Sequence, residues 1–220
     1  MVKNNLKIIT DTDKLSKRAQ EVNAVLDKKN VEKVINKLKT ILTKNKNLVA
    51  LSAPQIGKDM RVFCINFAGD IRAFINPMIS KSEGLTLVRE NCASIPDKEF
   101  IVPRNEKIIA FYQKPGGVPE SNRFEGVAAQ VFQQQVNLLD GVLISDFGLE
   151  VFEEFDQATE EEKTEVINLY LDNLKKLSAK FEDDIENSKD LKEISNAIKF
   201  MTAVANNEVT LESKEAINSK

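Results

Sequence analysis

The chain has 220 residues, which is enough to bury a hydrophobic core as one domain with an extension or as two small domains. Hydrophobic residues make up 42% and charged residues 30%, and the net charge of -3 gives no reason to expect nucleic acid as a partner. The N-terminal residues lack the apolar stretch of a signal peptide, and no run approaches the roughly 20 apolar residues of a membrane span. We therefore expect a cytoplasmic protein that does not bind a membrane.

Apolar spacing predicts two helices at the start of the chain, over residues 11–24 and 30–45. Short runs rich in β-branched and aromatic residues then predict strands at 49–52, 61–67, 71–75, 85–88 and 107–112. Residues 114–119 read as a loop, and residues 126–139 as a helix. This order predicts an α+β fold with antiparallel β-sheets around one central helix.

The composition changes after about residue 150. Thr159, followed three residues later by Glu162, is a capping-box pattern, and a helix is expected from there to about Glu186. A second helix should follow from Ser188, which would complete a C-terminal helical hairpin with a polar tail. We therefore predict two domains, 1–152 and 153–220.

The first helix of this hairpin carries an apolar stripe at alternating spacings of three and four residues, as in a short coiled-coil seam. Its members are candidates for a protein interface: Ile167, Tyr170, Leu174, Leu177 and Phe181. The alternative is that the hairpin closes on itself or docks on the sheet, and the sequence leaves both open.

Three motifs occur in order along the first 150 residues. Residues 50–57 read Ala-Leu-Ser-Ala-Pro-Gln-Ile-Gly, residues 90–94 read Glu-Asn-Cys-Ala-Ser, and residues 134–141 read Gln-Gln-Val-Asn-Leu-Leu-Asp-Gly. Together they resemble the peptide deformylase motifs Gly-x-Gly-Leu-Ala-Ala-Pro-Gln, Glu-Gly-Cys-Leu-Ser and His-Glu-x-x-His-x-Asp-Gly. The resemblance spans roughly residues 5 to 150 and implies the peptide-deformylase-like fold for them.

In that family, two histidines and the cysteine hold a metal, the glutamate moves a proton, and a glutamine with the backbone N–H after the cysteine stabilises an oxyanion. The resemblance places the retained groups at Gln55, Cys92 and Ala93. The three remaining positions are changed, to Gln134, Gln135 and Leu138, and the chain contains no histidine. A neutral amide is a poor metal ligand, leucine offers none, and glutamine is no general base. These changes predict no metal, no cofactor and no catalytic residue.

Two further residues are expected to have a structural role. The resemblance implies that Glu90 and Arg104 bridge the loop that carries Cys92.

Cys92 and Cys64 are too few for a disulfide framework, and Cys64 lies in an apolar run, which predicts a buried thiol.

The replaced positions favour a catalytically inactive relative of peptide deformylase that serves as a structural or interaction subunit, with a phage virion or another assembly as one setting. Its partners would be proteins, in a homo-oligomer or a larger hetero-assembly. Two alternatives remain open. One is a non-catalytic binding protein that recognises peptide N-termini in a remodelled cleft. The other is an active metal-dependent deformylase with non-standard ligands, such as Cys92 with nearby carboxylates.

Overall fold

A computed structural model of the chain describes residues 8–151 and 158–181. The chain divides into two units. The first contains residues up to 84 together with 92–96 and 104–143, and the second contains 85–91, 97–103 and the chain from 144 onward. No helix among the described residues has the length and apolar character needed to cross a bilayer.

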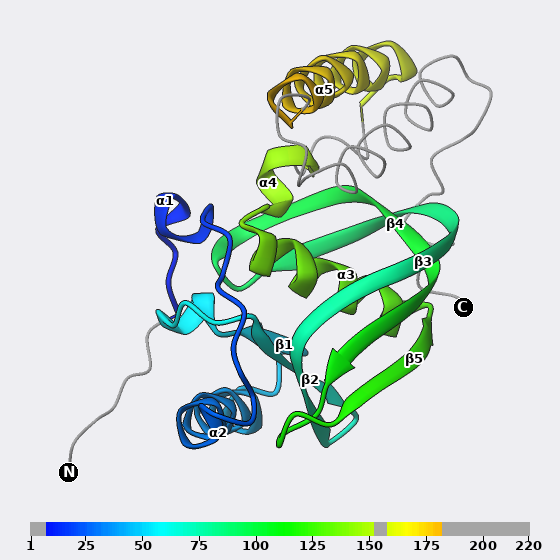
Figure 1. The fold of residues 1–220 in the computed structure, drawn as a ribbon. Coiled ribbons are helices and arrows are strands. Elements are labelled where there is room, and N and C mark those ends of the chain that lie inside the picture. Colours follow the sequence, from blue (N-terminus) through cyan, green and yellow to red (C-terminus); the bar gives the residue numbers. More distant parts are fainter. Residues whose placement is uncertain (1–7, 152–157, 182–220) are drawn as a thin grey trace. The chain divides into compact units, whose positions relative to one another are not determined.

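The structure combines helices with an antiparallel sheet (Figure 1). In chain order the elements are α1 (Thr12–Leu15), α2 (Lys28–Lys44), β1 (Ala50–Ser52), the 3-10 helix η1 (Pro54–Ile56), β2 (Val62–Phe67), β3 (Asp70–Cys92), β4 (Ile95–Gln113), β5 (Pro119–Glu125), α3 (Val127–Asp140), α4 (Ile144–Phe147), β6 (Leu149–Val151) and α5 (Glu160–Phe181). The strands follow the order β1-β2-β3-β4-β5, and β6 pairs with β4. The predicted α+β fold with antiparallel strands is confirmed.

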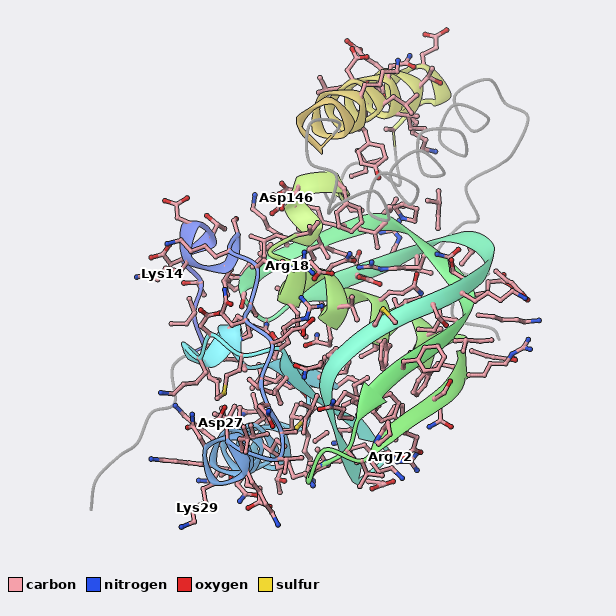
Figure 2. The ribbon with its side chains drawn as sticks, in the orientation of Figure 1. Lys14, Arg18, Asp27, Lys29, Arg72 and Asp146 are labelled. Carbon is pink, nitrogen blue, oxygen red and sulfur yellow. The ribbon has the colours of Figure 1, made fainter. Side chains whose placement is uncertain are left out.

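Strand β2 carries the core on both of its faces, because its side chains alternate in direction. Val62 and Cys64 belong to a cluster with α2, whose apolar residues recur at helical spacing. Phe63 and Ile65 belong to a second cluster, which includes residues of α3. Helices α2 and α3 therefore cover opposite faces of the strand, as Figure 1 shows, and the basic side chains of α2, such as Lys29, project away from it (Figure 2).

The second cluster is largely aromatic. The rings of Phe63, Phe74 and Phe132 meet pairwise with centroids 5.0 to 5.2 Å apart, and Phe124 stacks on Phe132 at 4.8 Å. Aromatic pairs in stacked or edge-on geometry add to the stabilisation that burial of their area provides. This cluster fixes α3 against the sheet.

The helix predicted over residues 11–24 is wrong beyond its first turn, since α1 ends at Leu15. The following residues are held by tertiary hydrogen bonds. The backbone N–H of Ala19 donates to Leu139, that of Gln20 to the Asp59 carboxylate, and that of Val22 to the Asn76 side chain. These bonds replace the helical ones, so helix propensity is overridden.

Strands β3 and β4 are longer than predicted, and β5 was missed. Strand β5 is polar and starts with Pro119, so it lacks the β-branched run that marks a strand. It forms because seven residue pairs join it to β4, from Lys107 with Glu125 to Gln113 with Pro119.

The second unit contains residues 85–91 of β3 and 97–103 of β4, together with α4, β6 and α5. Its strand pairing joins Ile101 to Leu149 and Glu99 to Val151, and Lys98 forms a 2.9 Å ion pair with Glu150. Helix α5 contacts α4.

The capping box at the start of α5 is confirmed. The backbone N–H of Thr159 donates to the Glu162 carboxylate at 2.8 Å, and the N–H of Glu162 donates to the Thr159 hydroxyl at 3.3 Å. Hydrogen bonds from Thr159 lower the pKa of Glu162. In the predicted stripe, Ile167 and Tyr170 are buried within the chain. The side chains of Leu174, Leu177 and Phe181 and the whole second helix of the hairpin lie outside the described part, so the interface and the division at 152 stay predictions.

Candidate functional site

Gln55 sits in η1, a single 3-10 turn whose ends the sequence defines. Pro54 starts the turn with its fixed φ, and Gly57 ends it at φ 71, a left-handed conformation that glycine adopts without strain. The backbone carbonyl of Gln55 accepts a 2.9 Å hydrogen bond from the N–H of Ile9, which ties the N-terminal segment to this turn.

The Gln55 side chain is buried, and both ends of its amide take part in hydrogen bonds. Its Oε1 accepts from the Ser52 backbone N–H at 2.9 Å and from the Ser52 hydroxyl at 3.1 Å. Its Nε2 donates to the Ser94 hydroxyl at 3.1 Å and points at the Cys92 sulfur at 3.9 Å. The site therefore joins the end of β1 to the turn between β3 and β4, where Ala93 is half-buried.

Two residues of this cluster, Ser52 and Ser94, were not assigned a role from the sequence. The signal for Ser52 was present, because Ser-Ala-Pro-Gln matches the Ser-x-x-Gln spacing of a capping box. Ser94 lies 39 residues from Gln55, so no local pattern connects them.

Helix α3 presents the other three predicted positions. Gln135 and Leu138 are buried, and Gln134 is half-buried. The Nε2 of Gln135 lies 3.5 Å from the Gln134 Oε1, at the limit of a hydrogen bond. The Gln135 Oε1 has no hydrogen-bond partner among the described residues. Helix α3 contacts β1, the strand that ends at Ser52.

The structure gives Arg104 a partner on α3. The Arg104 guanidinium donates to the Asn137 side chain. The next residue, Asn105, exchanges backbone and side-chain hydrogen bonds with Gln133 at 2.8 to 3.2 Å. Gln133 and Asn137 lie one turn apart on α3, so this polar seam holds β4 along one side of the helix. Glu90 is half-buried, and the predicted bridge from Glu90 to Arg104 stays a prediction.

A sequence model of the polypeptide deformylase family matches residues 5–148 of this chain. The chain belongs to the peptide deformylase family. A protein of Dictyoglomus turgidum named peptide deformylase is 35% identical over 128 residues, which cover 56% of this chain and 84% of that protein.

Solved structures of the family share the fold. Peptide deformylase from Thermotoga maritima is 30% identical, with a TM-score of 0.58, and the match covers 64% of this chain and 95% of that one. A probable peptide deformylase from Synechococcus phage S-SSM7 is 28% identical, with a TM-score of 0.59 and coverage of 64% and 99%.

These comparisons contradict the interpretation of the chain as a catalytically inactive structural or interaction subunit, of a virion or any other assembly. The family match covers residues 5–148, the relatives bear the name of an enzyme, and no finding indicates a structural subunit. The interpretation inferred loss of activity and of metal from a few side-chain types.

The donor set of the described residues does not fit the metal that the family's motifs imply. A tetrahedral site with an open position needs three protein ligands. Cys92 supplies one thiol, while Gln134 supplies a neutral amide and Leu138 a hydrocarbon side chain. In the described part of the chain, no group of three or more Cys, Asp or Glu side chains is placed to hold a metal ion.

Proposed function

We propose that this chain removes the formyl group from the formylated N-terminus of a peptide. The name of its relatives, peptide deformylase, suggests this substrate class and this reaction. The observation that supports this most is the Gln55 amide, whose NH2 group donates to Cys92 at the end of β3 and to Ser94 in the turn that follows. A fixed N–H donor in a buried site can stabilise the carbonyl oxygen of a bound formyl group and the negative charge that develops on it.

The surroundings of Gln55 favour a neutral ligand. The side-chain groups that hydrogen-bond to it are two hydroxyls and a thiol, and no carboxylate, ammonium or guanidinium group is among them. Burying an ammonium group without a counter-charge is costly, whereas a formamide is neutral and presents a carbonyl acceptor. The site should therefore prefer a formylated N-terminus to a free one.

The test measures release of free amine from a formyl-methionyl tripeptide by the purified full-length protein, alone and with added Fe²⁺, Ni²⁺ or Zn²⁺. Calorimetry with the formylated and the unformylated peptide is run on the same samples. We expect amine release and tighter binding of the formylated peptide. Gln55→Ala should lower turnover by about 100-fold, the usual cost of losing one oxyanion donor.

Gln130→Ala is a matched control, because Gln130 is a glutamine on α3 outside this cluster. It should leave turnover and binding unchanged. Absence of both binding and amine release under all metal conditions would overturn the proposal. Binding without amine release would overturn the reaction class and leave recognition of the formylated N-terminus.

A further inference from the structure

The amide of Gln55 has a defined orientation. A backbone N–H can only donate, so the Gln55 atom 2.9 Å from the Ser52 N–H must be the acceptor oxygen. The Ser52 hydroxyl donates to the same oxygen at 3.1 Å. Reversing the amide would break the bond with the backbone and place the NH2 group against the Ser52 N–H donor. Ser52 therefore fixes which end of the amide faces the turn between β3 and β4.

The opposite end of the amide is a donor with unused capacity. One hydrogen of Nε2 has a good acceptor in the Ser94 hydroxyl, at 3.1 Å. The other has only the Cys92 sulfur, at 3.9 Å, and sulfur is a weak acceptor. A ligand oxygen at ordinary hydrogen-bond distance would be a better partner for this second hydrogen.

Burial strengthens the effect of Ser52 on this donor. Ser52, Gln55 and Ser94 are at most 1% exposed. In such a low-dielectric environment, successive hydrogen bonds polarise one another. Two donors on Oε1 draw electron density toward the oxygen and make the Nε2 hydrogens more positive. Ser52 thus both orients and activates the amide.

We propose that Ser52 is a positioning residue, whose N–H and hydroxyl hold the Gln55 amide so that its NH2 group donates to the carbonyl oxygen of a bound substrate. Ser52 itself does not touch the substrate. The orientation of the amide follows from its two hydrogen bonds with Ser52, and only the identity of the ligand rests on the proposed function.

The first measurement is made on the wild-type protein by NMR, with the Gln55 side-chain amide assigned from its loss in Gln55→Ala. Nuclear Overhauser effects from the Nε2 hydrogens should reach the β-hydrogens of Cys92 and Ser94. Effects that instead connect these hydrogens with the Ser52 N–H would overturn the proposal. This result does not require any Ser52 variant to fold.

The second measurement compares Ser52→Ala with the wild type. Loss of the hydroxyl should shift the Gln55 amide resonances, speed hydrogen exchange at Nε2 and weaken binding of a formyl-methionyl peptide about fivefold, as expected for one hydrogen bond. Ser52→Thr, which keeps the hydroxyl, should restore the resonances. Ser80→Ala removes a hydroxyl that donates to Ile109 outside the site and should leave the Gln55 signals unchanged.

The outcomes separate the two proposals. Unchanged Gln55 resonances in Ser52→Ala would overturn the positioning role, even if the wild type binds and deformylates the peptide. Shifted resonances, together with a wild type that neither binds nor hydrolyses formylated peptides, would overturn the proposed function and support the positioning role.

Discussion

Arg61 forms a buried ion pair with Asp140 and so joins the residue before β2 to the last residue of α3. The Arg61 guanidinium lies 2.5 Å from the Asp140 carboxylate and also donates to the Leu139 carbonyl at 3.2 Å. Arg61 is 5% exposed, so its charge has little access to water.

Replacing Arg61 by alanine should destabilise the fold by about 3 kcal/mol, because removing one partner leaves the other charge largely buried without compensation. Lys81→Ala is the control, since its ion pair with Glu83 is exposed on both sides and should contribute little to stability. Urea denaturation of both variants checks this. Equal stability losses would show that the Arg61 pair is no stronger than a surface pair.

Gln133 should matter for stability more than its neighbours in the run of three glutamines. Its side chain takes part in hydrogen bonds with Asn105 and also donates to the Ala129 carbonyl at 3.0 Å. Gln133→Ala leaves the Asn105 backbone groups without these partners, at a cost of about 2 kcal/mol. Thermal unfolding measures the loss, with Gln130→Ala expected to change stability by less than about 0.5 kcal/mol. A Gln133→Ala protein as stable as the wild type would mean that water replaces these bonds.

Gly141 ends α3 at a position that excludes a side chain for two reasons. Its φ is 77, and an added Cβ would lie 2.8 Å from the backbone of Ser16. Gly141→Ala should therefore cost about 2 to 3 kcal/mol, combining left-handed strain with a displaced N-terminal segment.

Gly116→Ala separates the cost of the left-handed backbone from the cost of the contact with Ser16. Gly116 also has a positive φ, of 91, but nothing lies within 4 Å of an added Cβ. Its replacement should be the milder one in chemical denaturation. If both variants lose the same stability, contact with Ser16 contributes nothing and strain alone explains the loss.

Burial raises the pKa of the Cys64 thiol from 9.0 to about 12, and this effect outweighs the opposing charge of Lys39. Above pH 9 the unfolded chain releases this proton while the folded protein keeps it, so the unfolded state gains stability. The contribution of Cys64 is fully present below pH 9 and is lost as pH rises from 9 to 12. The expected slope is up to about 1.4 kcal/mol per pH unit.

Cys64→Val removes this titration while filling a similar volume. We expect the free energy of unfolding of the wild type to fall more steeply than that of the variant between pH 9 and 10.5. Parallel curves would contradict the assigned pKa. A thiol reagent at pH 8 should leave Cys64 unmodified in the folded protein and modify it after unfolding.

The sequence alone determined what depends on near neighbours in the chain. The helical spacing of Val31, Val34 and Leu38 predicted α2, and Thr159 with Glu162 predicted the cap of α5. The three motifs predicted the family, and the fold followed from it. Ser52 and Gln55, two of the residues that meet in the candidate site, are only three positions apart, so their contact is also local in the sequence.

Only the tertiary structure decided what depends on distant partners. Residues 16–24 are not helical, because their backbone groups bond to Asn76, Asp59 and Leu139. The polar strand β5 exists because β4 offers it a pairing edge. Ser94 meets Gln55 across 39 residues, and Gln133 meets Asn105 across 28. Such contacts depend on chain closure by the whole fold, and no periodicity in the sequence encodes them.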